Sequence, residues 1–454
     1  MLKINDLRAF WRSFLGARFG KFCSWGLFLA VFAVLAAGCG DRERDLSESV
    51  ACSQLHPLKY SKALRLDSLY GERVAEIRSV VGRDTLVKRF VFRRPELAAG
   101  EGLKTQPLHR CLDGALVLPA PVGRIVALSS AQVGYLLRLD AGDRIVAVGE
   151  GKYIADSALF YRVEGNGATG QPRLDSASSR LAGTVAEVGN GTSLNLEKLV
   201  ALGPDLVMTF ATGGSQDDYQ RLAALGLPLM LTSEWQEDSP LAKMEWIKLY
   251  AMMLDDGSNR MMARADSIFG EEAVKYVRVA IREKLQESSR SAFASGQKTA
   301  GSRDAAGSCP RVLAGMSYGG VWYAPGGNSY TARLIRDAGG CYLWAADTSR
   351  ELRLTLEEVF ALGDSVDVWI NPGMFASAGD ILATEPRVAQ FKAFREKRVY
   401  QNDGRKGPGG GNDFYEGAVA RSGELLQNLQ DCIHEGSEKA ASASVGPKWY
   451  HNIF

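Results

Sequence analysis

The sequence predicts an α/β fold of two similar lobes, because one order of helix and strand occurs twice along its 454 residues. Residues 194–203 carry apolar side chains at helical spacing, end in glycine and lead into the short apolar run 204–208. Residues 354–363 and 364–370 repeat this order in the second half. A helix that stops at glycine before a short apolar run is typical of alternating α/β structure.

Further elements flank each copy in the same order. An expected strand and helix come before it, and a helix end and another strand come after it. In the first half these segments are residues 124–130, 133–139 and 222–231. In the second half they are residues 311–317, 330–338 and 391–400. Four matched elements in one order predict Rossmann-like lobes with parallel sheets.

A single long helix is expected to join the two lobes. From Ser258 to about Gln286, apolar residues recur at helical spacing and charged residues lie between them. The pattern predicts an amphipathic helix on the order of 40 Å long, with Gly270 as a candidate kink. Residues 288–308 are rich in Ser, Ala and Gly and are expected to form a flexible linker.

The first forty residues predict export. Basic residues precede an apolar run of about 13 residues, which is too short to span a membrane. The run ends in Leu35-Ala-Ala-Gly-Cys39, which resembles the lipobox of bacterial lipoproteins, with the leucine one place earlier than usual. The resemblance implies that Cys39 becomes a lipid-bearing N-terminus whose acyl chains hold the protein on a membrane. An ordinary secretory signal with an incidental cysteine is the alternative.

The expected organisation has six parts. Alternating apolar residues at 86–92 predict a small β-rich N-terminal extension before the first lobe. The expected boundaries are 1–38 for the signal peptide, 39–121 for a tether and the extension, 122–240 for the first lobe, 241–308 for the helix and linker, 309–435 for the second lobe, and 436–454 for a tail.

Export permits disulfides in the mature chain. The two pairs to be tested are Cys52 with Cys111 and Cys309 with Cys341. Once Cys39 is set aside, five cysteines follow it, so at least one must lie outside any bridge.

Charge and histidine placement exclude several classes of function. The formal net charge is only +2, so no nucleic-acid partner is expected. No histidine falls within residues 110–433. A histidine-rich zinc site, a Ser-His-Asp triad or a Cys-His pair therefore cannot form in the main body. We assign no catalytic residue and no metal ligand, and expect a pre-formed chelate rather than a bare metal ion.

Several motifs together resemble the substrate-binding proteins of ABC importers that carry iron–siderophore complexes, haem or cobalamin. The resemblance covers about residues 122–435. It rests on residues 124–130, 143–149, 194–197, 204–207, 225–228, 234–247 and 407–413. It implies two α/β lobes joined by one long helix, a ligand in the cleft between them and modest closure. It also implies no enzymatic activity, no resident cofactor, and an ABC permease with its ATPase as partners of a monomer.

The same resemblance implies a role for the duplicated glutamates Glu197 and Glu357. In such proteins an acidic residue on each lobe meets arginines of the permease. A negative charge also suits the N-terminus of a helix, so simple capping is the alternative.

In doubly wound sheets, ligands lie beyond the carboxyl ends of the strands. Aromatic side chains on such loops can stack on flat conjugated rings, and the Pro408-Gly-Gly-Gly411 run would let a backbone approach the ligand closely. The candidates in the first lobe are Ser130, Gln132, Tyr153, Asn190, Phe210 and Thr212. Those in the second lobe are Tyr318, Trp322, Tyr323, Asn371, Asn402 and Asn412. Trp246 and Trp369 lie in periodic segments and are assigned to the core.

The expected function is capture of a metal chelate outside the cytoplasm and its delivery to an inner-membrane permease. Two alternatives stay open: an extracytoplasmic enzyme of similar two-lobe fold, chelatase-like or hydrolytic, and a lipoprotein that sequesters haem or a corrinoid without a transporter. The choice among siderophore, haem and cobalamin stays open as well, as does the membrane, cell or outer, that holds the anchor.

Overall fold

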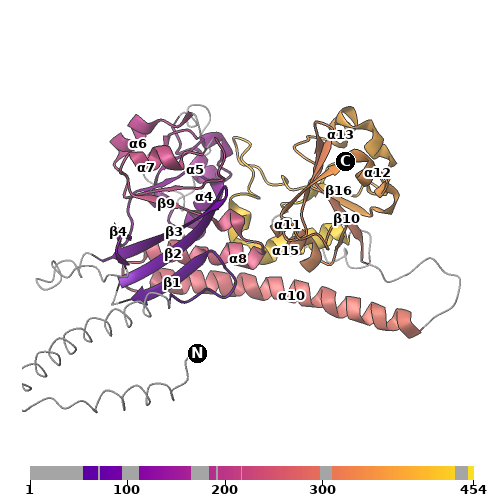
Figure 1. The fold of residues 1–454 in the computed structure, drawn as a ribbon, viewed down its shortest axis with the longest axis horizontal. Coiled ribbons are helices and arrows are strands. Elements are labelled where there is room, and N and C mark those ends of the chain that lie inside the picture. The colour runs from indigo at the N-terminus through magenta and orange to yellow at the C-terminus, as the bar shows by residue number, and fades with distance from the viewer. Residues whose placement is uncertain are drawn as a thin grey trace, which may run out of the picture. The chain divides into compact units, whose positions relative to one another are not determined.

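The computed structural model describes residues 55–69, 72–94, 112–164, 184–190, 193–215, 217–296, 309–434 and 448–454. Cys39, Cys52 and Cys111 lie outside these residues. Leu55–Gln106 and Gly114–Phe454 form one compact unit that contains both predicted lobes. The described residues form four sheets, two of which are the predicted parallel sheets of the lobes (Figure 1).

The first lobe has a five-stranded sheet of order β7-β6-β5-β8-β9 in which every strand pair is parallel. Its strands are β5 (Ile125–Ala127), β6 (Ile145–Val148), β7 (Ala186–Glu187), β8 (Leu206–Thr209) and β9 (Leu229–Leu231). Its helices are α4 (Ser130–Arg138), α5 (Ser157–Phe160), α6 (Leu196–Leu202) and α7 (Tyr219–Ala224). The order reverses at β5, as in doubly wound sheets.

The second lobe repeats this plan. Its main sheet has the order β13-β10-β15-β16-β17, and a small antiparallel sheet has the order β11-β12-β14. The strands are β10 (Arg311–Ala314), β11 (Met316–Tyr318), β12 (Val321–Pro325), β13 (Cys341–Tyr342), β14 (Glu351–Thr355), β15 (Val368–Ile370), β16 (Val399–Gln401) and β17 (His451–Asn452). The helices are α11 (Tyr330–Asp337), α12 (Leu356–Phe360), α13 (Ala378–Thr384), α14 (Lys392–Arg395) and α15 (Ser422–Ile433).

The duplication is confirmed by the way α6 and α12 begin. Asn195 caps α6 by accepting a hydrogen bond from the backbone N–H of Lys198, and Thr355 caps α12 in a capping box with Glu358. Helix α6 ends at Gly203, whose φ of 54° is the left-handed conformation that glycine adopts without steric cost. Strands β8 and β15 follow the two helices, and both are interior strands of their sheets.

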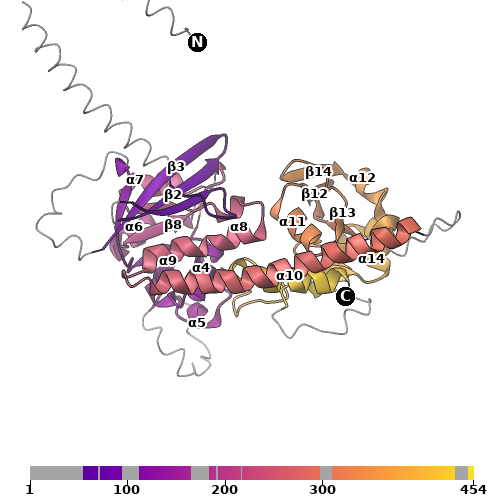
Figure 2. The same cartoon turned by 90° about the horizontal axis from the view of Figure 1, so that it is seen from below.

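Helix α10 (Arg260–Gly296) is longer than predicted and joins the lobes. Its 37 residues span about 55 Å, and Gly270 does not interrupt it. Figure 2 shows α10 running along both lobes. Ala265 and Phe269 pack in the first-lobe core, while Tyr276 and Val279 pack in the second-lobe core. The expectation of a flexible linker from residue 288 is wrong for 288–296, because these residues continue the helix. None of the described helices is long and apolar enough to cross a membrane.

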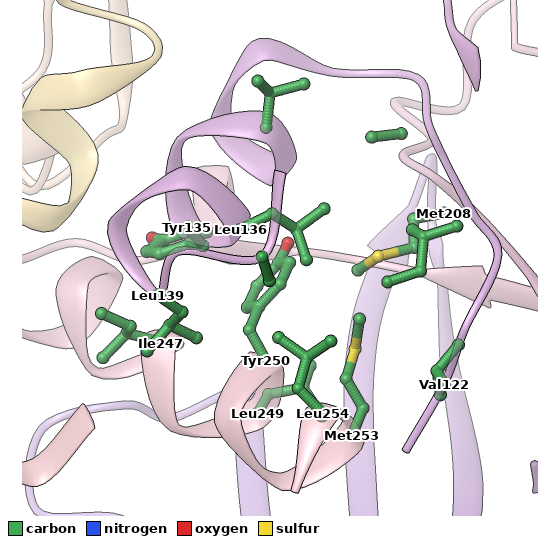
Figure 3. Close-up of a cluster of buried hydrophobic side chains, with 14 of the residues drawn as sticks. Val122, Tyr135, Leu136, Leu139, Met208, Ile247, Leu249, Tyr250, Met253 and Leu254 are labelled. Atoms are coloured by element: carbon green, nitrogen blue, oxygen red, sulfur yellow. The ribbon is translucent and has the colours of Figure 1, made fainter. Parts of the chain in front are cut away.

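The boundary at residue 240 also differs from the prediction. Helix α9 (Ile247–Leu254) belongs to the first-lobe core, where its side chains meet α4 (Figure 3). Helix α8 (Pro240–Glu245) contributes Met244 to this core and Leu241 to the core of the second lobe. The rings of Tyr135 and Tyr250 lie 4.7 Å apart between these helices. Trp246 and Trp369 are buried as predicted.

The predicted β-rich extension is confirmed, but it is not a separate body. Strands β1 (Leu64–Leu69), β2 (Glu72–Val81), β3 (Asp84–Arg93) and β4 (Leu116–Pro119) form its sheet. Ile77, Phe90 and Phe92 of this sheet share one continuous core with the first lobe. At the other end of the chain, the expected tail contributes the edge strand β17 and the buried Trp449 to the second lobe.

The disulfide between Cys309 and Cys341 is present, as predicted. It joins the segment just before β10 to β13, the neighbouring strand in the sheet. Cys432 is buried in the second-lobe core and takes no part in that bridge.

Two buried carboxylates hold the segment before β1. Glu245 accepts hydrogen bonds from the backbone N–H groups of Lys59, Tyr60 and Ser61, at 3.2, 2.8 and 3.0 Å. Glu237 accepts from the hydroxyl of Ser61 and from the N–H groups that follow it at residues 62 and 63. The indole N–H of Trp246 donates to Glu237 at 3.0 Å. We call residues 59–63 with these two glutamates the carboxylate clamp.

Replacing Glu245 with Ala should lower the free energy of unfolding by about 3 kcal/mol, because three backbone donors lose their acceptor. Chemical denaturation measures the loss. Trypsin should also cut faster after Lys59 and Lys62, which are exposed. Glu271→Ala on the exposed face of α10 is the control and should stay within about 0.5 kcal/mol of the wild type. Equal stability of the two variants would contradict the clamp.

Candidate ligand-binding site

The loops at the carboxyl ends of both parallel sheets hold most of the predicted site residues. Ser130 is half-buried in the first turn of α4, directly after β5. Tyr153 and Phe210 follow β6 and β8 and are exposed, as is Tyr318 at the end of β11. Tyr323 on β12 and Asn402 after β16 are half-buried. These loops therefore offer aromatic rings to solvent on both lobes.

Two predicted ligand contacts are wrong, because their side chains are fully buried. The side-chain carbonyl of Gln132 accepts from the N–H groups of Leu128 and Ser129, and its amide donates to the Thr232 hydroxyl at 3.0 Å. Gln132 thus completes the capping box of α4. Trp322 donates its indole N–H to the Ala314 carbonyl at 3.3 Å and packs against other aromatic rings of the core.

Four more candidates shape the loops on which they lie. The backbone N–H and the hydroxyl of Thr212 both donate to the carboxylate of Asp217. The side-chain oxygen of Asn412 accepts from Phe414 N–H at 2.9 Å. Asn190 is half-buried and lies so close to Gly149 that a Cβ there would be 2.2 Å from its side-chain oxygen. Asn371 directly follows β15 and has a left-handed φ of 52°.

The glycine-rich loop at residues 407–411 meets the first lobe. A Cβ on Gly407 would lie 2.5 Å from the Ile154 carbonyl, and one on Gly411 would lie 2.4 Å from the Tyr153 carbonyl. A Cβ on Gly409 would meet the Phe160 ring at the same 2.4 Å. These glycines let the loop approach the first-lobe backbone closely. The sequence had suggested that they allow close approach to a ligand instead.

Residues 402–421, which we call the strap, carry the chain from β16 across to the first lobe. Glu416 on the strap is buried and accepts hydrogen bonds from the N–H groups of Ala155 and Asp156, at 2.9 and 2.7 Å. The next residues form the 3-10 helix η9 (Gly417–Ala420), which packs on α4. Burial raises the pKa of Glu416 to about 7, and the carboxylates of Asp156 and Asp413 act in the same direction.

A cluster of polar groups lies where α8 meets α11 and was missed by sequence reasoning. The ammonium of Lys243 lies 5.3 Å from the centre of the Tyr330 ring, and the Tyr135 hydroxyl donates to the Lys243 carbonyl at 2.6 Å. Burial lowers the pKa of Lys243 and raises that of Glu234, while their opposite charges act against both shifts. Within the described residues, Glu234 Oε2 and the Tyr250 hydroxyl are buried without a hydrogen-bond partner. No spacing in the sequence marks residues that meet only through the packing of two helices.

A small pocket lies inside the second lobe. Its wall includes Trp322, Trp369 and Phe375, and its cavity volume of about 10 Å³ leaves room for about one water molecule. Small-molecule pockets begin at roughly 300 Å³, so this one does not suit a ligand of tetrapyrrole size. In the part of the chain that the structure describes, no group of three or more His, Cys, Asp or Glu side chains could hold a metal ion.

The two candidate docking residues occupy equivalent positions. Glu197 and Glu357 are each the second residue of their helix, α6 and α12, and both are exposed. The Arg387 guanidinium lies 4.0 Å from the Glu357 carboxylate, which is still 81% exposed. Each carboxylate is therefore free to meet an external cation as well as to cap its helix.

Comparison with known proteins places this architecture in a family. The chain matches the periplasmic binding protein family over residues 125–405, which is more than half of its length. The protein therefore belongs to the periplasmic binding protein family. Membership makes it a solute-binding component of the ABC-transport type and not an enzyme.

Individual relatives are distant. The chain is 20% identical over 326 residues to an uncharacterized lipoprotein of Methanocaldococcus jannaschii, covering 71% of this chain and 67% of that protein. It is similar to the periplasmic vitamin B12 binding protein BtuF of Vibrio cholerae, with 14% identity, 71% and 99% of the two chains covered and a TM-score of 0.42. For the periplasmic heme binding protein HutB of Vibrio cholerae, the identity is 16%, the shares are 68% and 98%, and the TM-score is 0.44.

Glu416 should make stability depend on pH. Its pKa is about 7 in the folded protein against an ordinary value of 4.5, so between these values the folded state holds a proton that the unfolded state has lost. The resulting stabilisation, roughly 3 kcal/mol, is complete below pH of about 4.5 and is lost as the pH rises through about 7.

Glu416→Gln should therefore flatten the fall of the unfolding free energy between about pH 5 and 7, as measured by denaturant titrations across that range. Glu271→Gln, at an exposed site on α10, should keep the slope of the wild type. A wild-type slope in the Glu416 variant would show that this carboxyl group does not take up the proton.

Proposed function

We propose that this protein captures a metal chelate, namely an iron–siderophore complex, haem or a corrinoid, and delivers it to an ABC permease. The observation that carries the proposal is the exposure of aromatic rings on the strand-end loops of both lobes: Tyr153 and Phe210 on the first, Tyr318 on the second. Flat rings stack on conjugated or apolar ligand surfaces. Membership of the periplasmic binding protein family supports delivery of the captured solute to an ABC transporter.

A cation lies beside each of two aromatic rings of the candidate site, Tyr153 and Tyr323. The Lys152 ammonium lies 4.9 Å from the centre of the Tyr153 ring, and the Arg353 guanidinium lies 5.7 Å from that of Tyr323. Each cation also has a carboxylate nearby, with Glu150 at 2.6 Å and Glu351 at 3.7 Å. An arginine or lysine next to a ring suits a ligand that combines a flat surface with carboxylate or phenolate groups.

Optical titration of the full chain in detergent with haem, cobalamin, cobinamide and ferric siderophores tests the ligand class. One class should give a saturable spectral change, and Phe210→Ala or Tyr153→Ala should weaken its binding about 5- to 10-fold through lost stacking. Phe454→Ala is the matched control, because Phe454 is 49% exposed against 40% for Phe210. Phe454 follows β17, which runs antiparallel to β16. It therefore lies at the amino end of β16, whereas the ligand loops lie at the carboxyl ends of the parallel strands. Absence of binding by every chelate would refute the proposal.

At the membrane, we propose that Cys39 carries the lipid and that Glu197 and Glu357 meet cations of the permease. Both glutamates lie outside the ligand loops, and exposed ion pairs contribute mainly register and specificity. The lipobox motif and the lipoprotein relative support the anchor.

In cells, the Glu197→Ala, Glu357→Ala double variant should keep its ligand affinity and membrane fractionation but lose most ligand uptake. A double variant of two other exposed glutamates, Glu271→Ala with Glu396→Ala, controls for lost charge. Cys39→Ser should instead release the chain from the membrane fraction. Normal uptake by the first variant would leave helix capping as the sole role of the two glutamates.

A further inference from the structure

The β2–β3 hairpin of the N-terminal extension reaches a loop of the proposed ligand site. Its turn residue Gly82 has a φ of 63°, and it faces Gly213, whose φ is 85°. A Cβ on Gly213 would lie 2.3 Å from the Gly82 nitrogen and 2.5 Å from its Cα. Gly213 belongs to the loop after β8 that also carries Phe210. The hairpin and this loop thus pack backbone against backbone.

The edge of the hairpin is tied to the 3-10 helix η6 (Glu234–Gln236). The Gln236 side chain acts like a neighbouring strand, since its oxygen accepts from Val80 N–H at 2.9 Å and its amide donates to the Val80 carbonyl at 2.6 Å. The Ser233 hydroxyl donates to the Arg78 carbonyl at 2.8 Å. From the second lobe, the Arg350 guanidinium donates to the Gln236 backbone carbonyl. The hairpin, the first lobe and the second lobe therefore meet at Gln236.

This junction leaves large apolar side chains in solvent. Val80 is 51% exposed, Trp235 is 42% exposed and Phe210 is 40% exposed. They come from the hairpin edge, from η6 after β9 and from the loop after β8. Contiguous exposed apolar patches mark binding sites, whereas single exposed apolar side chains are ordinary. The Gly82–Gly213 contact and the hydrogen bonds between Val80 and Gln236 join the three elements that carry these side chains. One of these elements, the loop after β8, belongs to the proposed ligand site.

We propose that the β2–β3 hairpin forms a wall of the ligand site, and that Val80, with Trp235 and Phe210, contacts an apolar ring face of the bound chelate. The inference rests on the proposed function and deepens it by naming a specificity element. The hairpin precedes residues 125–405, so this element lies outside the part of the chain that matches the family. It favours a chelate with a broad apolar face over one with a fully polar surface.

Val80→Asp in the full chain tests the wall, with haem, cobinamide and a ferric hydroxamate as probes in the same optical titration. The bound chelate should lose at least about tenfold in affinity, because a carboxylate would face its apolar surface. The hairpin should remain folded, because Gln236 binds the backbone of Val80 and not its side chain. Val274→Asp on α10 is the matched control, since Val274 is 58% exposed and should leave affinity within about twofold.

Gln236→Leu gives a second, independent variant. It removes both hydrogen bonds to the Val80 edge and should weaken binding while Val80 itself is unchanged. Wild-type affinity in both Val80→Asp and Gln236→Leu would contradict the proposal that the β2–β3 hairpin forms a wall of the ligand site. If Phe210→Ala still weakened binding in that case, the proposed function would stand without the hairpin. No binding of any chelate by the wild type would overturn both proposals.

Discussion

The backbone N–H groups of residues 59–63 need hydrogen-bond acceptors where this segment packs against the first lobe. The first lobe supplies these acceptors with two buried carboxylates. Burying a carboxylate is costly unless several donors surround it, and burying unpaired N–H groups is costly as well. Glu237 and Glu245 meet both requirements at once. Their clamp places β1, and through β1 the sheet whose Phe90 and Phe92 complete the first-lobe core. The position of the β2–β3 hairpin against the loop after β8 follows from that placement.

The two lobes are joined by more than α10. The strap returns from β16 to the first lobe, where glycines bring its backbone against residues 153–155 and Glu416 accepts two of that lobe's N–H groups. Arg350 adds a third contact at Gln236. A stiff helix with two further ties favours small changes of lobe geometry over wide opening. The ties also explain why residues that look suited to ligand contact, such as the glycines after Pro408, serve the scaffold.

Periodic patterns predicted the elements well and the roles of single polar residues poorly. The strands, helix caps and duplicated glutamates follow from local spacing, and Cys309 pairs with Cys341 as expected. Gln132 was misassigned because the third residue of a helix can point either toward a ligand or back toward the residue that caps the helix. In α4 the side chain of Gln132 turns back and completes the capping box with Ser129. Trp322 was misassigned because strand alternation does not say which face is covered. Lys243 and Glu416 gave no signal, because Tyr330 and Ala155, which they contact, are more than 80 residues away in the chain.

The sequence by itself determined the number of lobes, their element order and the helix that joins them, because hydrophobic periodicity and capping residues act over a few positions. It also determined the aromatic character of the strand-end loops. Only the tertiary structure decided that the extension belongs to the first lobe, that the strap crosses between lobes, and that the β2–β3 hairpin packs through Gly82 against Gly213 in the loop after β8. These outcomes depend on buried hydrogen bonds and glycine contacts between distant segments, whose energies exist only once the chain has folded.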